Sequence, residues 1–361
     1  MAKKKSDKDL LKSVSPGKIF IPIAIGLAYI GYMMYKEVDL DKLTSIQLAK
    51  YAVIWIILAF LMMVIRDFGY IVRLKILSDG KFTWLQAFRV IMLWEFTSAV
   101  TPSAIGGTSV AILYVNKEGM SVGESSSVVM ATSFLDELYF ILMFPLLFFA
   151  ISPAQLFGID GETDIYNKFF YFAVGGYSIK LAYLLILSYG LFKNPRGLKW
   201  LILMIFKLPI LRRWKHGAND AGTEIIKSSR ELKKKPFKFW LKAFAATFFS
   251  WTARYWIVNI LLISLLLSKY TTGDHFLIFA RQLVMWIMMI IFPTPGGSGF
   301  AEGFFEVFLG DFIPNVGGLA IALALVWRLV SYYPYLIIGA FMLPKWIKRH
   351  FLEGKNKLEK K

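Results

Sequence analysis

Cysteine is absent from all 361 residues, and histidine occurs only three times. Without a thiol the chain can form no disulfide, no thiolate nucleophile and no thiolate metal site. His216, His275 and His350 lie far apart in the sequence, which leaves no histidine cluster for a metal. Neither a glycine-rich phosphate loop nor a Ser/His/Asp set is recognisable. We therefore expect no catalytic centre, no metal and no cofactor.

Acidic residues are also scarce, with 24 Asp and Glu against 42 Lys and Arg and a net charge of +18. Such an excess is found in nucleic-acid-binding proteins, but it is equally typical of the cytoplasmic loops of membrane proteins. Hydrophobic residues make up 57% of the chain, and apolar runs of membrane-spanning length recur. The composition predicts an all-α polytopic membrane protein with no nucleic-acid partner.

Six apolar segments are long enough to span a bilayer. One set of connecting segments holds 31 Lys and Arg against 9 acids, and the other holds 4 against 7. Because Lys and Arg are retained on the cytoplasmic side, we expect the basic set and both termini to be cytoplasmic, in the inner (cell) membrane. The expected spans are about 19–35, 51–66, 122–151, 168–192, 240–267 and 316–343. The basic segments are 1–18, 66–83, 193–242 and 344–361.

This topology predicts two re-entrant helical hairpins. The chain is inside at 66–83 and inside again before the span at 122–151, so residues 84–120 must enter the membrane and return. It is outside at 268–275 and outside again before the last span, so residues 276–314 must do the same from the opposite face. The hairpins turn at similar phrases, TPSAIGG from Thr101 and TPGGSGF from Thr294.

The two halves of the chain resemble each other in spacing. Arg89 lies 12 residues before Thr101, and Arg281 lies 13 before Thr294. Asp136 lies 35 residues after Thr101, and Arg328 lies 34 after Thr294. The pattern of span, hairpin and span thus occurs twice with opposite orientation, which is typical of the inverted repeats of secondary transporters.

The domain organisation follows from these boundaries. A basic cytoplasmic tail (1–18) precedes one membrane domain (19–343), and a second basic tail (344–361) follows it. The domain carries a basic cytoplasmic insert at 193–239, in which 197–208 reads as an interfacial amphipathic helix. Residues 218–235 read as a cytoplasmic helix with Glu231 facing Lys234 or Lys235. Its basic face suits either solvent or anionic headgroups.

The second hairpin contains the phrase FPTPGGSGFAEGFF, residues 292–305. Irregular backbone at membrane depth is tolerated where protein encloses it or where it lines a wet cavity. A half-helix beginning near Phe300 is expected to present free N–H groups to a phosphate or carboxylate. The alternative is a tight connection between two helices, with Glu302 capping the second. The glycines and proline assigned to substrate binding are Gly106, Gly107, Pro295, Gly296, Gly297 and Gly299.

Charged side chains inside expected spans support a binding site. On insertion scales each costs about 2.5–3.5 kcal/mol at the centre of a span, so these residues are expected to face the bundle interior. Their excess of cations favours an anionic headgroup; the alternative is static pairing of Glu302 with Arg328 and of Asp136 with Arg89. The candidate substrate-binding residues are Arg89, Asp136, Lys180, Arg254, Arg281, Glu302 and Arg328. Asp136 and Glu137 are adjacent and point about 100° apart on a helix, so they cannot form a facing acid/base pair.

At these residues the sequence resembles the lysylphosphatidylglycerol synthase/flippase transmembrane family, the membrane part of the multiple peptide resistance factors and their stand-alone relatives. The resemblance covers about residues 15–345. Its most specific element is the phrase Pro-x-Pro-Gly-Gly-x-Gly-x-x-Glu from Pro293 to Glu302; Arg328, followed by aromatics and Gly339, supports it. The resemblance implies movement of lipids between leaflets, with aminoacylated phosphatidylglycerol as the best-known cargo of the family.

Two features depart from the family prototype. The chain ends in KWIKRHFLEGKNKLEKK with no aminoacyl-transferase domain, so we expect no lysyl-lipid synthesis. Thr108 stands where relatives often carry an acidic residue, which leaves a polyprenyl-phosphate-linked or other anionic lipid as an alternative cargo. The function expected is therefore a lipid flippase, compatible with a homo-oligomer. The alternative is a membrane-embedded lipid-modifying enzyme or an accessory subunit of envelope lipid or glycan assembly.

Overall fold

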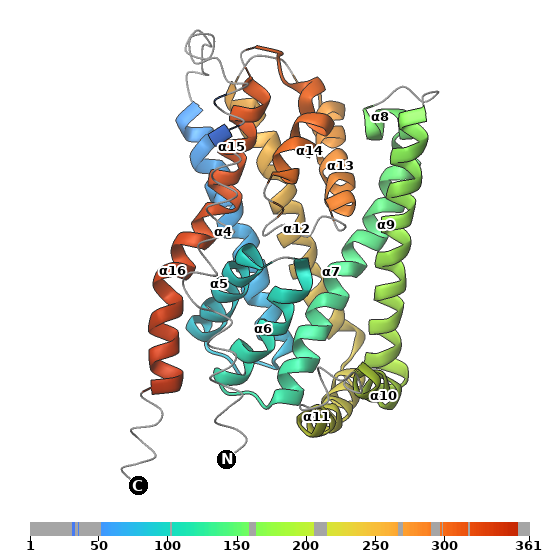
Figure 1. The fold of residues 1–361 in the computed structure, drawn as a ribbon, viewed down its shortest axis with the longest axis vertical. Helices are drawn as coiled ribbons and strands as arrows, with labels where there is room; N and C mark the ends of the chain where they lie inside the picture. Colours follow the sequence, from blue (N-terminus) through green and yellow to red (C-terminus); the bar gives the residue numbers. More distant parts are fainter. Residues whose placement is uncertain are drawn as a thin grey trace.

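The structure is a computed structural model that describes residues 52–101, 103–158, 164–205, 215–265, 270–289, 299–316 and 318–352, with Gly31, Tyr32, Tyr35 and Gly297. Every regular element in this part of the chain is helical, which confirms the all-α class (Figure 1). The basic tail 1–18, most of the expected first span and the tip residues Pro295 and Gly296 lie outside the described residues.

Long helices form the body of the molecule. Four helical segments are long and apolar enough to cross a membrane. They overlap four of the five spans expected from residue 51 onward, and the expected span at 240–267 is the one not among them. That segment forms α12 (Phe237–Leu265), whose 29 residues reach about 43 Å at 1.5 Å per residue. This length exceeds the hydrocarbon core of a bilayer, about 30 Å. The four segments are Ala52–Leu77, Val122–Ala150, Phe170–Lys193 and Leu319–Phe351.

Helix α4 (Ala52–Leu77) packs against α12 along most of its length. Small residues permit the close approach, because a Cβ added at Gly69 would lie 2.2 Å from Ser250 Oγ. The same hydroxyl donates a hydrogen bond to the carbonyl oxygen of Arg66 at 2.9 Å. The outer face of α4 leaves large apolar side chains uncovered, which suits contact with lipid tails. These exposed residues are Val53, Ile54, Ile57, Phe60, Leu61, Val64 and Phe68.

Helix α4 also corrects a predicted boundary. A cytoplasmic connection was expected from residue 66, but the helix continues without a break to Leu77. Arg66 and Arg73, which were counted as loop cations, are both buried. The physical reason is that carboxylates on neighbouring helices neutralise them, so that the helix can remain inside the bundle.

Two pairs of shorter helices occupy the expected hairpin positions, at opposite ends of the molecule (Figure 1). The first pair is α5 (Trp84–Val100) and α6 (Ser103–Lys117), which pack against each other. The second pair is α13 (Thr272–Met288) and α14 (Phe300–Leu309). That each pair enters the membrane from its own face remains a prediction.

In each helix pair, one contact joins the segment before the first helix to the segment after the second helix. Before α5, Lys81 Nζ pairs with Glu124 at the start of α7 (Val122–Ala150) at 2.6 Å. Before α13, the Tyr270 hydroxyl donates to the carbonyl oxygen of Phe312, just after α14, at 2.8 Å. In each pair the chain therefore returns to the end from which it left.

The last expected span, 316–343, is divided into two helices. Helices α15 (Leu319–Ser331) and α16 (Tyr333–Ile347) are separated by the single residue Tyr332. Tyr332 has φ −130° and ψ −55°, outside the helical range, and Pro334 follows in the first turn of α16. A proline lacks the N–H that would continue the helix, which accounts for the break at this point.

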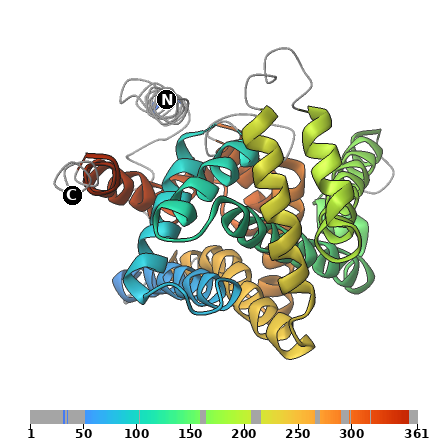
Figure 2. The same cartoon turned by 90° about the horizontal axis from the view of Figure 1, so that it is seen from below.

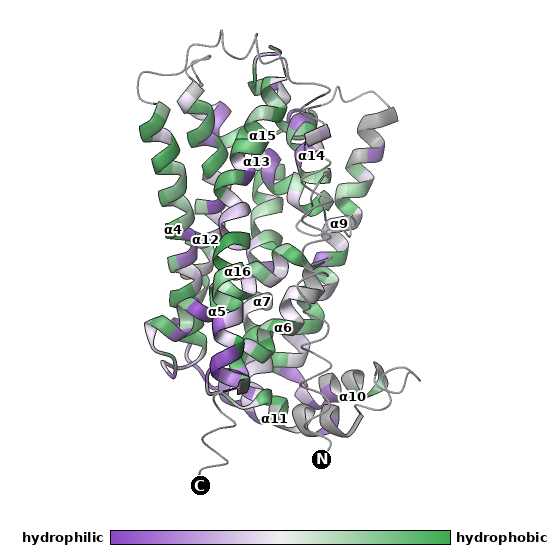
Figure 3. Ribbon diagram, turned by 60° about the vertical axis from the view of Figure 1, so that its left-hand side comes forward, coloured by the Kyte–Doolittle hydropathy of each residue, from purple (hydrophilic) through white to green (hydrophobic). Residues whose placement is uncertain are grey.

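The basic insert lies at one end of the bundle. Helix α9 (Asp164–Ser188) ends in a π-helical turn, Tyr189–Lys193, that leads into α10 (Pro195–Ile205). Helices α10 and α11 (Lys215–Lys233) then lie side by side across that end (Figure 2). Both expected helices of the insert are present. Hydrophobic residues run along α4, α7 and α16, and hydrophilic residues gather toward the end that holds α11 (Figure 3). The remaining described elements are the short α8 (Pro153–Phe157), a 3-10 turn at Gly310–Phe312 and a π-helical turn at Lys348–Leu352.

One contact expected in the insert is replaced by another. Glu231 was expected to face Lys234 or Lys235, but Lys235 Nζ pairs with Asp79 at 2.8 Å. Asp79 lies in the turn after α4, so this pair fastens the end of α11 to the end of α4.

Candidate functional site

Asp136 and Glu137 on α7 bind cations on two different helices. Arg73 of α4 donates to both Asp136 oxygens, at 2.5 and 3.3 Å, and Trp251 Nε1 of α12 donates at 2.7 Å. Lys180 of α9 donates to Glu137 at 2.9 and 3.1 Å. The divergence of two adjacent side chains is confirmed, and each is occupied by its own ion pair. The proposed pairing of Asp136 with Arg89 is wrong, because Arg73 takes that carboxylate.

Arg89 and Arg281 instead fasten the bases of the two helix pairs. Arg89 on α5 donates to Glu118, just after α6, at 2.8 and 3.1 Å. Arg281 on α13 donates to Asp311, just after α14, at 2.8 Å. The partners are separated by 29 and 30 residues respectively. The same bond thus joins the two legs of each hairpin, which supports the repeat expected from the spacing of the arginines.

The groups around Glu118 lower the pKa of its carboxyl by more than burial raises it. Burial alone raises the pKa of this carboxyl, but the hydrogen bond and positive charge of Arg89 act in the opposite direction. His350 and Trp346 add to the effect of Arg89, and the pKa of Glu118 falls below its usual range. The base of the first hairpin therefore keeps a charged carboxylate at neutral pH.

Arg281 has further contacts that make it structural. Its Nε donates to the carbonyl oxygen of Gln155 at 2.8 Å, and its Nη1 donates to that of Phe308 at 3.0 Å. These bonds connect α13 with α8 and with the end of α14. Arg89 and Arg281 are thus both bound to acceptors of the protein itself at the bases of the hairpins.

Glu302 and Arg328 form a buried ion pair, as the static alternative proposed. Arg328 Nε donates to Glu302 Oε1 at 2.7 Å, and both residues are at most 5% exposed. The second oxygen of Glu302 accepts the backbone N–H of Gly299 at 2.7 Å. Helix α14 begins at Phe300 as expected, but its N-terminus is capped by the protein's own carboxylate, which takes the place expected for a bound anion.

The loop before α14 requires glycine at two described positions. Gly297 has φ +69° and Gly299 has φ +88°, a region that side chains with a Cβ rarely adopt. A Cβ added at Gly297 would lie 2.3 Å from Met289 Cε at the end of α13. These glycines therefore permit both the turn and a close contact between the legs of the hairpin.

Gly106 and Gly107 occupy a different position in the first hairpin from the one expected. They lie inside α6, which begins at Ser103, rather than in the turn before it. A Cβ added at Gly107 would lie 2.0 Å from Ser98 Oγ and 2.9 Å from Ser98 Cα. Gly107 thus lets α6 approach the backbone of α5. Gly339 acts in the same way for α16, where a Cβ would lie 2.0 Å from Phe96 of α5.

The sequence interpretation missed a further buried cluster, centred on Arg66. Arg66 Nη2 donates to Glu95 of α5 at 2.6 Å, and Nη1 donates to the Tyr335 hydroxyl of α16 at 2.7 Å. Nη1 also donates to Asp67 at 2.9 Å. The signal available in the sequence was Glu95, an acid within the apolar phrase VIMLWEFTSAV. An isolated acid at that depth requires a cation, and Arg66 supplies it.

Arg254 is the exception among the candidate cations. It lies on α12, half-buried, and no carboxylate of the described residues is within ion-pair distance of it. Its guanidinium carbon lies 5.6 Å from the ring centre of Trp251 and 5.0 Å from that of Trp286 on α13. Aromatic faces stabilise a cation without neutralising its charge. Arg254 therefore keeps an unneutralised positive charge between two helices.

This cation lies near the glycine loop of the second hairpin. Trp286 and Met289 are three residues apart at the end of α13, so they share a face of the helix. Trp286 contacts Arg254, and Met289 contacts Gly297. Arginine presents a planar fork that binds phosphate oxygens in pairs. The arrangement can hold an anion, and no group of His, Asp and Glu among the described residues could hold a metal ion.

Comparisons with known proteins agree with this architecture. The family model described as lysylphosphatidylglycerol synthase TM region matches residues 19–339. A UPF0104 membrane protein of Archaeoglobus fulgidus is 26% identical over 297 residues, which cover 79% of this chain and 84% of the relative. No solved structure matches the chain.

Proposed function

The chain belongs to the lysylphosphatidylglycerol synthase transmembrane-region family, and from this membership we propose that it moves an anionic lipid between the leaflets of a cell membrane. The single observation that carries the proposal is the unneutralised charge of Arg254. Each of the other candidate cations has a protein carboxylate as its partner, whereas among the described residues Arg254 contacts aromatic faces and no carboxylate.

The class of cargo that we propose is supported by which charges are already paired. A lysyl headgroup needs a free carboxylate, but Asp136, Glu137 and Glu302 are each bound to a cation. A phosphate needs a free cation, and Arg254 is suited to that role. We therefore propose a phospholipid or polyprenyl-phosphate-type lipid rather than an aminoacylated one.

The structure around Arg254 favours transport of a lipid over its chemical modification. Charged pairs tie α4, α7 and α9 together and Trp251 of α12 hydrogen-bonds to Asp136, while the α13–α14 loop depends on glycines with positive φ. Arg254 lies where the tied helices meet this glycine-dependent loop. A headgroup held there could pass between leaflets while its tails remain in the lipid beside the exposed apolar face of the bundle.

Reconstitution into liposomes tests the proposal. The purified full-length protein is incorporated into vesicles that contain fluorescent phosphatidylglycerol, phosphatidylcholine or polyprenyl phosphate, and the fraction of label accessible to an external quencher is followed. We expect accelerated redistribution of an anionic lipid over protein-free vesicles. Covalent conversion of the labelled lipid, detected by chromatography, would instead indicate a lipid-modifying enzyme. Unchanged lipid with no acceleration for any of the three would contradict the proposal.

A further inference from the structure

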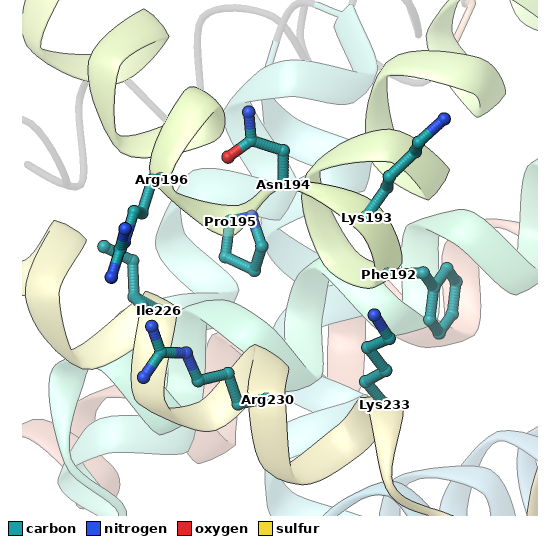
Figure 4. Close-up of a pocket in the computed structure, with 8 residues that line it drawn as sticks. All are labelled: Phe192, Lys193, Asn194, Pro195, Arg196, Ile226, Arg230 and Lys233. Atoms are coloured by element: carbon teal, nitrogen blue, oxygen red, sulfur yellow. The ribbon is translucent and has the colours of Figure 1, made fainter.

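A second concentration of positive charge lies outside the membrane bundle, where α9, α10 and α11 meet. A pocket of about 370 Å³ opens there, between the π-helical turn at the end of α9 and the facing sides of α10 and α11. This volume is within the range of small-molecule sites, about 300–1,000 Å³. Its lining residues are Phe192, Lys193, Asn194, Pro195, Arg196, Ile226, Arg230 and Lys233 (Figure 4).

Four of the eight lining residues are cations, and none is a carboxylate. Arg230 and Lys233 are three residues apart on α11, so they share one helix face although like charges repel there. Figure 4 shows the guanidinium groups of Arg196 and Arg230 on the same side of the pocket, while Lys193 points away from them. No ion pair to an acidic side chain of the described residues neutralises these groups. Such an arrangement favours a bound anion.

The helices that carry the pocket residues are packed against the rest of the protein. The ring of Phe192 at its base packs against Phe134 of α7 at 5.2 Å and against Trp240 of α12 at 5.0 Å between ring centres. Helices α10 and α11 are joined by a hydrogen bond from Lys199 Nζ to Thr223 Oγ1 at 2.8 Å. The spacing between Arg196 and Arg230 is therefore held by the packing of the helices that carry them.

The position of the pocket indicates a ligand at the membrane surface. Helix α10 follows directly from a membrane-spanning helix and exposes Trp200 and Met204, which are four residues apart on one face. Tryptophan favours the level of the lipid headgroups. An apolar face turned to lipid beside a cationic pocket places that pocket at the depth of headgroup phosphates.

We propose that this pocket binds a phosphate group, in the first place that of an anionic lipid headgroup, at a site separate from Arg254. The bidentate fork of arginine suits phosphate oxygens, and two arginines with a neighbouring lysine match a doubly charged phosphate monoester. A soluble phosphate compound presents the same chemistry, and the experiment distinguishes the two sources.

The test compares two triple variants of the full-length protein in detergent. Arg196→Gln, Arg230→Gln and Lys233→Gln remove the pocket cations, and Lys227→Gln, Lys234→Gln and Lys238→Gln remove three exposed cations nearby that do not line the pocket. Thermal unfolding is followed while short-chain phosphatidylglycerol, short-chain phosphatidic acid or inorganic pyrophosphate is added. A ligand that binds the folded protein raises the unfolding temperature in a saturable way.

We expect the wild type and the control variant to be stabilised by the anionic lipids, and the pocket variant to need at least about tenfold more lipid for the same shift. If pyrophosphate alone gives the same pocket-dependent shift, the phosphate comes from a soluble compound. If the pocket variant responds to every ligand as the control does, the proposal is wrong. If the triple variant fails to fold, Arg230→Glu replaces it, because one reversed charge must also weaken the response.

Discussion

Arg328 Nε donates a hydrogen bond to Glu302 Oε1 at 2.7 Å, and the two side chains are buried between α15 and α14. Removal of one member of such a pair leaves an unpaired buried charge, which costs about 3–5 kcal/mol. We therefore expect Glu302→Gln and Arg328→Gln each to lower the unfolding temperature strongly. The double variant should be more stable than either single one. It should still fall below the wild type, because Glu302 also caps Gly299.

The unfolding temperatures of the wild type, the two single variants and the double variant are measured in detergent. Size-exclusion chromatography is the control for aggregation. Additive losses in the double variant would mean that the two side chains act separately and that Arg328 has another partner of equal importance.

Substitution of Gly297, which has a positive φ, tests whether the loop of the second hairpin has a role in transport. Gly297→Val should abolish lipid redistribution and destabilise the protein, since strain of this kind costs about 1–3 kcal/mol and the new side chain would also overlap Met289. Gly303→Ala is the matched control, because Gly303 lies in α14 with nothing within 4 Å of an added Cβ. Redistribution at the wild-type rate by the Gly297 variant would mean that the loop is only a connection.

The contact between Arg89 and Glu118 predicts that the stability of the protein depends on pH. The folded-state pKa of Glu118 is lowered, so the stability it contributes is present above the unfolded pKa, about 4.3, and is lost as the pH falls through the folded value. The unfolding temperature of the wild type should fall on acidification below about pH 4.3 by more than that of Glu118→Gln. Glu231→Gln, which removes an exposed carboxylate on α11, should behave like the wild type. Equal acid sensitivity of Glu118→Gln and wild type would contradict this role of the Arg89 contact.

The topology itself is open to cysteine labelling, because the parent chain has no cysteine. Cysteines at Lys81 and Ser121, which flank the first hairpin, should react with an impermeant reagent from the same side as a cysteine at Lys233. A cysteine at Thr272 should react from the other side. Labelling of the Lys81 and Ser121 positions from opposite faces would mean that α5 and α6 cross the membrane together.

The fold class and the hairpin positions could be predicted because they depend on local composition. Apolar runs mark the long helices. The excess of Lys and Arg in alternate loops places both ends of 84–120 on one side of the membrane and both ends of 276–314 on the other, so each segment must cross an even number of times or re-enter. The end of α4 could not be predicted in this way. Arg66 and Arg73 look like loop residues until their partners Glu95 and Asp136, which are 29 and 63 residues away, are brought beside them.

The pairing of charges also depends on how each helix is rotated about its axis, which spacing does not specify. Asp136 has the sequence position to meet Arg89, but the rotation of α7 turns it toward Arg73 and Trp251. The pairing of Glu302 with Arg328 could be weighed from the sequence, as the alternative to headgroup binding, because the two residues lie in consecutive apolar segments that form α14 and α15. The unpaired state of Arg254 becomes visible only in the structure, where the buried carboxylates Asp136, Glu137 and Glu302 are bound to other cations.

The measurement that tests the central claim most directly is lipid redistribution by Arg254→Gln in liposomes, with Lys242→Gln as the control on the exposed face of the same helix. A charge-assisted hydrogen bond contributes about 1.5–3 kcal/mol, so the rate for fluorescent phosphatidylglycerol should fall by roughly 10- to 100-fold in Arg254→Gln. Arg254→Lys should recover part of that rate, because it restores the charge without the planar fork. The control should redistribute lipid like the wild type. Wild-type rates in a correctly folded Arg254→Gln would contradict the claim that this arginine binds the headgroup.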